Sequence, residues 1–119
     1  MSKMILKKAL ILSLFSLSVS SVQAEQNKDL IVNRCNDLAK MVKSLVVSQH
    51  NPICVDKLAL AANQMNVAAA LIADDSVDQA KQIIVNAVND LQFAELTGCS
   101  HYIQISHSKV EAIKLRHLL

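Results

Sequence analysis

Two histidines and two cysteines are the side chains of this 119-residue chain best suited to chemistry. His50 lies four positions before Cys54, and Cys99 lies two positions before His101. Two imidazoles and two thiolates make a plausible tetrahedral ligand set for zinc or for a soft copper ion. The spacings match no strong zinc signature, because the chain lacks a Cys-x-x-Cys pair. A metal site of His50, Cys54, Cys99 and His101 is therefore one alternative, and a bond between the two cysteines is the other.

The N-terminal segment favours the bond, because residues 1–24 are typical of a cleavable secretory signal peptide. Three lysines precede a short apolar run at 9–17, and Val22 and Ala24 supply the small side chains that a signal peptidase accepts. We expect export to the periplasm or the exterior, where thiols pair with each other. We also expect one mature domain over residues 25–119, with no stable membrane anchor because the apolar run is too short to span a bilayer.

Removal of the signal peptide changes the charge balance of the chain. The full chain has 12 basic and 10 acidic residues, and three of the basic ones, Lys3, Lys7 and Lys8, lie in the signal. The mature chain therefore keeps nine basic and ten acidic residues, a formal charge of −1. No basic surplus remains to neutralise phosphates, and aromatic residues for base stacking are scarce. We expect no nucleic-acid partner.

Residues 76–98 carry the clearest helical pattern, and the remaining elements can be arranged around it. Ser76 with Gln79 forms a capping-box pattern, and aspartates at 74, 75 and 78 would lie near the positive helix start. Gly98 stands where a left-handed C-terminal cap is expected. Apolar residues recur at spacings of three and four, as on one buried helix face. These are Val77, Ala80, Ile84, Ala87, Leu91 and Ala94.

Two further long helices are predicted upstream, over residues 27–49 and 52–73. Asn51 is a good N-cap and Pro52 fits the first helical position, so the second helix begins there. That helix is apolar nearly all round, which places it centrally or under a second subunit. The expected inward positions of the two helices are Ile31, Cys35, Leu38, Val42 and Leu45, then Val55, Leu58, Ala62, Met65, Ala69 and Ile72.

The last segment allows two interpretations. Ser108 and Glu111 form a second capping box, so a short helix could begin at Ser108. A continuous helix from Ser100, with Ile103, Val110 and Ile113 inward, is the other possibility. Either way the fold is an all-α, up-down-up-down four-helix bundle, with three long helices and a shorter or broken fourth.

This topology indicates which cysteines pair. Cys54 begins the second helix and Cys99 follows the third, so both lie at the same end of the bundle. Cys35 lies about two turns into the first helix, on its apolar side, and is expected to be a buried thiol. We predict a Cys54–Cys99 disulfide; a bridge to Cys35 would require an offset bundle.

Motifs for catalysis and for cofactors are missing from the sequence. There is no Gly-x-Ser-x-Gly, no glycine-rich phosphate loop and no Cys-x-x-Cys-His haem attachment motif. The aspartates near residue 76 are explained by their place at a helix start. We therefore expect a protein that is not an enzyme and has no cofactor.

The apolar excess favours binding of another protein, or of a second copy of the chain. Leu30, Val32 and Met41 fall outside the inward positions of the first helix, and the chain ends in Leu118-Leu119. Contiguous exposed apolar patches usually mark partner sites. The hypothesis is a non-enzymatic exported module, such as an inhibitor or immunity-type partner, an adaptor or a small chaperone. The competing interpretation is that these side chains fill a well-packed monomer core.

A short segment at Cys99, Tyr102 and Ile103, with a cysteine upstream in the first helix, resembles small exported immunity proteins of contact-dependent secretion systems. Those proteins tend to have glycines around the second cysteine, which this chain lacks. The resemblance covers a few residues, and no site is carried over from it.

Overall fold

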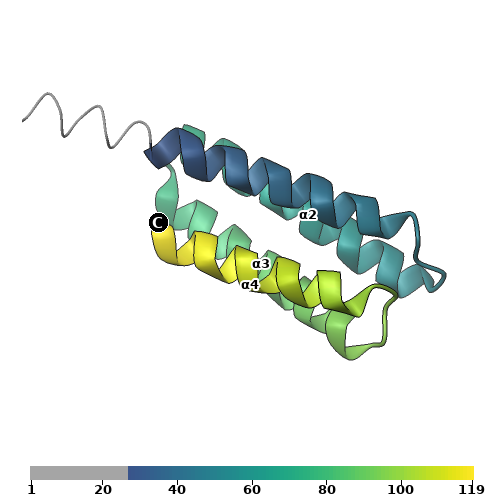
Figure 1. Ribbon diagram of the computed structural model, residues 1–119. Coiled ribbons are helices and arrows are strands. Elements are labelled where there is room, and N and C mark those ends of the chain that lie inside the picture. The colour runs from purple at the N-terminus through teal and green to yellow at the C-terminus, as the bar shows by residue number, and fades with distance from the viewer. Residues whose placement is uncertain (1–26) are drawn as a thin grey trace, which may run out of the picture.

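Four helices form an up-down-up-down bundle, as predicted (Figure 1). The computed structural model describes residues 27–119, so the predicted signal peptide and its cleavage site lie outside the described residues. Residues 27–46 are helical, and α2 (Pro52–Ala73), α3 (Val77–Leu96) and α4 (Tyr102–Leu118) follow. Between residues 27 and 119 there is no strand. No helix in this range is long and apolar enough to cross a membrane.

The core is built from the predicted apolar faces. The interior positions of α3 are confirmed from Ala80 to Ala94, and Val77 at the helix start is half-buried. In helix 27–46 and α2 the interior positions are likewise buried, except that Ile31 and Val55 are half-buried. Small side chains let the helices approach closely, and nine alanines are buried. They are Ala39, Ala61, Ala62, Ala68, Ala69, Ala80, Ala87 and Ala94, to which α4 adds Ala112 as a ninth.

The start of α2 follows the predicted local chemistry. The Asn51 side-chain oxygen accepts a hydrogen bond from the Ile53 N–H at 3.1 Å, and Pro52 occupies the first turn. The end of α2 falls at Asp74 and Asp75, and Asp78 lies in the first turn of α3. Asp75 takes a left-handed conformation (φ 62°), with the Ser76 N–H bonded to the Leu71 carbonyl at 2.8 Å. Asp75 therefore closes α2 in a Schellman-type turn, two residues before α3 begins.

The capping box predicted at Ser76 is wrong, because the Ser76 side chain makes no cap hydrogen bond. Its backbone belongs to the tight turn that ends α2, which leaves the residue at ψ 62° and away from the extended geometry usual for an N-cap. The predicted cap at the other end is confirmed. Gly98 has φ 76°, and the Cys99 N–H bonds to the Ala94 carbonyl at 3.3 Å.

α4 is continuous from Tyr102, so the capping box predicted at Ser108 is also wrong. Ser108 lies inside the helix and is fully buried, since the helix turns a different side inward from the one expected. Ile103 and Val110 are exposed and Ile113 is half-buried. Packing in the bundle outweighs the local capping signal here. The buried positions of α4 are Ile105, Ser108, Ala112 and Leu115.

Candidate functional site

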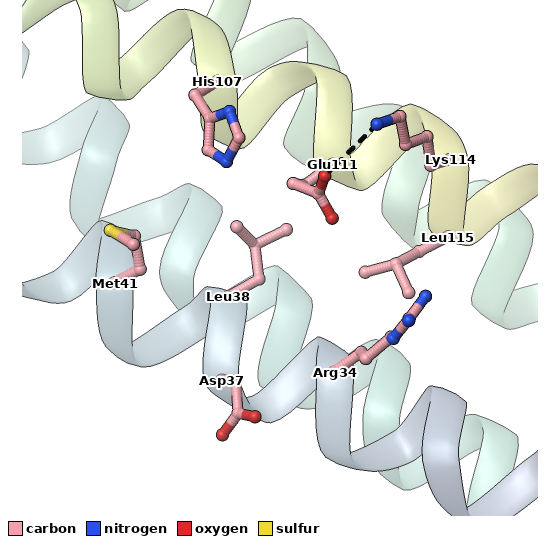
Figure 2. Close-up of a pocket in the computed structure, with 8 residues that line it drawn as sticks. All are labelled: Arg34, Asp37, Leu38, Met41, His107, Glu111, Lys114 and Leu115. Atoms are coloured by element: carbon pink, nitrogen blue, oxygen red, sulfur yellow. Dashed lines mark ion pairs between the residues drawn. The ribbon is translucent and has the colours of Figure 1, made fainter.

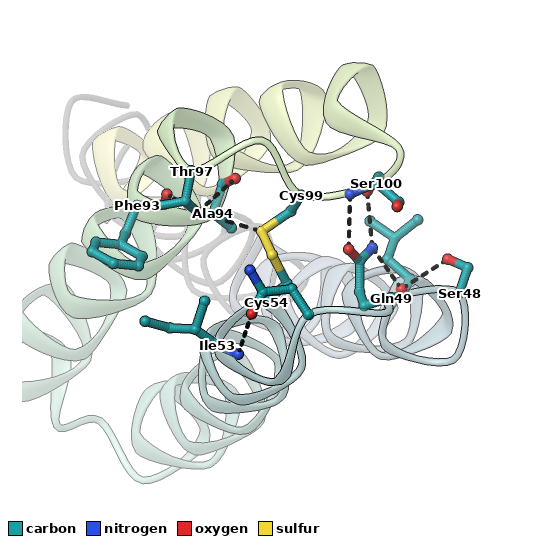
Figure 3. Close-up of a disulfide and its surroundings, with 11 residues drawn as sticks. Ser48, Gln49, Ile53, Cys54, Phe93, Ala94, Thr97, Cys99 and Ser100 are labelled. Carbon is teal, nitrogen blue, oxygen red and sulfur yellow. Dashed lines mark hydrogen bonds between the residues drawn. A yellow bond between two sulfur atoms is a disulfide. The ribbon is translucent and has the colours of Figure 1, made fainter.

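The disulfide end of the bundle combines rigidity with exposed apolar side chains; it is defined here as residues 44–55 and 96–108. Cys54 lies in the first turn of α2 and Cys99 in the loop before α4, and they form the predicted disulfide with 5.7 Å between their Cα atoms (Figure 3). Both cysteines are buried. The bond joins the start of α2 to the α3–α4 loop, and it is the chemistry expected of an oxidising compartment.

A hydrogen-bonded glutamine joins the two loops of this end beside the disulfide. The Gln49 side-chain oxygen accepts from the Ser100 N–H at 2.8 Å, and its amide donates to the Ser100 carbonyl at 2.8 Å. The same amide donates to the Leu45 carbonyl at 3.0 Å (Figure 3). Gln49 is buried, so these bonds replace the water that its amide would otherwise require. No sequence signal distinguishes Gln49 from the other glutamines of the chain, because its partner is 51 residues away.

The loop that follows Cys99 holds its last residue in an unusual conformation. His101 has φ 63°, the left-handed region that residues other than glycine rarely occupy. Its carbonyl accepts the first hydrogen bond of α4, from the Ile105 N–H at 3.1 Å. Cys99 and Ser100 on one side and the helix on the other therefore hold His101 in place, and Tyr102 and Ile103 follow it directly.

The most exposed large apolar side chains of residues 27–119 lie at this end. Val47 in the first loop is 89% exposed, Leu96 at the end of α3 is 74% exposed and Ile103 at the start of α4 is 71% exposed. Tyr102 is next in the order of exposure, and Ile53 also lies at this end. The sequence pattern predicts Ile103 as an inward position of a continuous last helix and does not single out Leu96, because both residues continue a helical pattern that also fits a buried face.

Formal charges are missing from this end. Neither residues 44–55 nor residues 96–108 include a lysine, an arginine, an aspartate or a glutamate. The ionisable side chains that remain are those of three exposed histidines, His50, His101 and His107, and of Tyr102. Interface cores are depleted of charge and rich in aromatic and aliphatic side chains, which is the composition found here.

Two charged side chains just below this end have partners, whereas Lys43 and Asp56, which border it in sequence, are exposed. Lys57 lies 3.5 Å from an Asp90 oxygen, and its ammonium is 5.0 Å from the centre of the Phe93 ring. Glu95 accepts from the Ser106 hydroxyl and from Lys109 at 2.9 Å, which joins α3 to α4. These two hydrogen bonds, that of the Ser106 hydroxyl first, hold the pKa of Glu95 below its ordinary value.

The four residues of the alternative metal site are placed differently from a ligand set. Cys54 and Cys99 are joined to each other, so neither is available as a thiolate. His50 and His101 are exposed on different loops. Over residues 27–119, no group of three or more histidine, cysteine, aspartate or glutamate side chains is arranged to hold a metal ion.

The third cysteine, Cys35, is a free thiol at 0% exposure, and burial raises its pKa to about 11. A thiol with that pKa is a poor nucleophile at neutral pH.

A groove of about 440 Å³ lies between helix 27–46 and α4 (Figure 2). Its charges are mixed, and Lys114 lies 3.5 Å from Glu111. Figure 2 shows His107 and Met41 near one end of the groove and Arg34 near the other. Its lining combines both signs of charge with two leucines and lacks a serine or cysteine that a base could activate. The lining residues are Arg34, Asp37, Leu38, Met41, His107, Glu111, Lys114 and Leu115.

Comparison of the chain with protein-family models, with curated proteins and with solved structures finds no match.

Proposed function

We propose that this chain is a non-enzymatic, exported binding module that docks a partner protein through its disulfide end. One observation carries the proposal: the most exposed large apolar side chains, Val47, Leu96 and Ile103, all lie at an end without formal charge. Exposed apolar surface of this kind is unfavourable in water unless a partner covers it.

The rigidity of this end supports a specific partner. The disulfide and the Gln49–Ser100 hydrogen bonds hold the two loops in one arrangement before any partner arrives. A preformed surface loses less conformational entropy on binding than a flexible one. Promiscuous binders instead rely on flexible, methionine-rich surfaces, and this end has no methionine. An inhibitor, an immunity-type partner or an adaptor therefore fits the surface better than a general chaperone.

The compartment of the proposal is the periplasm or the exterior of the cell. The disulfide is the chemistry of an oxidising environment, and the N-terminal sequence has the features of a secretory signal. A partner would be met after export, in the same compartment. The paired cysteines stabilise the docking surface there and take no direct part in binding.

Site-specific photocrosslinking tests the proposal. A photoreactive residue in place of Ile103 should crosslink a discrete partner in intact cells, whereas the same residue in place of Val110 should not. Val110 is exposed on the same helix, seven residues further from the disulfide end, and so is a matched control. With the captured partner purified, Ile103→Lys should weaken binding by tenfold or more, since truncation or charging of a central contact typically costs over 1 kcal/mol. Equal crosslinking at both positions, or unchanged affinity, would contradict the proposal.

A further inference from the structure

A second groove, of about 340 Å³, lies between helix 27–46 and α2. It is continuous with the disulfide end, because Val46 and Val47 belong to residues 44–55 and also line the groove. Its volume is near the lower end of the range of about 300–1,000 Å³ that is usual for ligand pockets. The groove therefore has room for a few side chains of a partner that already covers Val47.

Apolar and polar side chains line different parts of this groove. Ala62 is buried and Ala59 is exposed, and both are small enough for an apolar side chain to lie against them. The polar lining consists of Lys43, Asn63 and Asn66, and all three are exposed. The two asparagines are three residues apart and so lie on the same side of α2. Within residues 27–119 none of these three side chains has a hydrogen bond or an ion pair.

The groove carries a formal charge of one sign only. Lys43 is its charged residue, and α2 has no charge from residue 58 to residue 73. Asp56, the acidic residue of α2, precedes this stretch and is not among the lining residues. By contrast, two basic and two acidic side chains line the groove of Figure 2. A carboxylate is the complementary group for the second groove, since it can accept hydrogen bonds from an ammonium and from side-chain amides.

We infer that this groove binds an acidic side chain of the partner protein, with an apolar neighbour of that side chain against Ala59 and Ala62. The inference rests on the proposed function, because the groove extends the same docking surface beyond Val47. Charge complementarity across an interface fixes the register and excludes wrong partners more than it adds affinity. Lys43 thus supplies an electrostatic selectivity that the uncharged disulfide end lacks.

Photocrosslinking in intact cells tests this inference, with a photoreactive residue in place of Asn63. Position 63 should capture the same protein as position 103, because one partner covers both surfaces. Lys43→Glu should lower the yield at position 63 by at least about tenfold, since two carboxylates would then face each other. Lys40→Glu is the matched control and should leave the yield unchanged. Lys40 is exposed on the same helix and undergoes the same change of charge, but it does not line the groove.

The two proposals can fail separately in this experiment. Absence of an adduct at position 63, a different protein there, or equal effects of Lys43→Glu and Lys40→Glu would overturn the groove inference. An adduct at position 103 would still support the proposed function in each of these cases. Failure of position 103 to capture a partner would instead count against the proposed function.

The salt dependence of binding tests whether the contact is ionic. The affinity of the purified partner for the wild-type chain should fall as sodium chloride is raised from about 0.05 M to about 0.5 M, because salt screens exposed charges. Lys43→Gln should remove most of this dependence, whereas Lys40→Gln should retain it. Equal salt dependence in the two variants would overturn the assignment of a carboxylate to the groove.

Discussion

The two ends of the bundle are built in opposite ways. The disulfide end is neutral, tied by a covalent bond and by the Gln49–Ser100 hydrogen bonds, and bears the most exposed apolar side chains. The opposite end, defined as residues 27–31, 71–81 and 114–119, has eight charged residues. There an ion pair of 2.9 Å joins Lys28 to Asp75, whose side chain is 80% exposed.

The two ends differ in the kind of interaction that stabilises them. Exposed ion pairs contribute little to the free energy of unfolding because water and salt screen them. They do keep the opposite end well solvated. The disulfide end presents apolar surface to water and is held by a buried disulfide and by the partly buried Gln49–Ser100 hydrogen bonds. The docking proposal requires this contrast between the two ends, and five measurements test it.

The largest effect is expected from removal of the disulfide. Replacing Cys54 and Cys99 by alanine opens a loop of 45 residues and should lower the free energy of unfolding by about 4 kcal/mol. Urea unfolding of the wild-type protein with and without a reductant compares the free energy of unfolding in the absence and in the presence of the disulfide. The double variant is the control, since a reductant should not change its stability. A wild-type protein indifferent to reduction would contradict the role assigned to this bond.

Gln49→Ala is expected to have the next largest effect. The change removes three hydrogen bonds and leaves the N–H and carbonyl of Ser100 without their partner, at a cost of about 2–3 kcal/mol. Ser48→Ala is the neighbouring control, because the Ser48 hydroxyl bonds only to the nearby Leu45 carbonyl of the preceding helix, and its loss should cost under about 0.5 kcal/mol. Equal urea midpoints for the two variants would show that the loops are not held together by Gln49.

Glu95→Gln should destabilise the protein by about 1–2 kcal/mol at neutral pH, because a carboxylate that accepts two hydrogen bonds becomes an amide. The pKa of Glu95 is lowered in the folded protein, so its contribution is full above the ordinary value of 4.5 and is lost as pH falls through the lowered pKa. The difference between wild type and Glu95→Gln should therefore decrease as the pH falls below 4.5 and through the lowered pKa.

Asp75→Asn is the matched control for Glu95 at the opposite end. It removes the exposed ion pair with Lys28 while keeping a residue that tolerates the left-handed conformation. Its effect at neutral pH should be under about 0.5 kcal/mol. A larger loss for Asp75→Asn than for Glu95→Gln would reverse the comparison between the two ends.

The last comparison concerns the two left-handed residues that close α2 and α3. Gly98→Ala should lower stability by about 1 kcal/mol, from backbone strain alone, because a Cβ at Gly98 would meet no atom within 4 Å. Asp75→Gly should raise it by up to about 1 kcal/mol, since glycine removes the strain at φ 62°. Thermal unfolding measures the stability of each variant relative to wild type. A Gly98→Ala variant more stable than wild type would contradict the left-handed conformation of Gly98.

Much of the architecture could be predicted because it depends on local rules. The three–four spacing of apolar residues in α3 predicts its buried face, and Asn51-Pro52 predicts where α2 begins. Gly98 predicts the end of α3. The pairing of Cys54 with Cys99 follows from topology, since an antiparallel bundle leaves only these two cysteines at one end.

The remaining features depend on residues that are distant in sequence. Ser76 and Ser108 both begin capping patterns that the structure does not use, because the turn at Asp75 and the burial of α4 compete with them. The buried position of Gln49 depends on Ser100, 51 residues away, and no local pattern encodes such a partner.

The sequence by itself determined that this chain is helical, that its helices have one strongly apolar face each, and that two cysteines meet. Only the tertiary structure decided which apolar residues stay in water. Leu96 and Ile103 continue helical patterns that would also fit a buried face, and whether a neighbouring helix covers them depends on where each helix ends and how it is rotated. That rotation is set by the packing of all four helices together, so exposure, and with it the candidate docking surface, is a property of the assembled bundle.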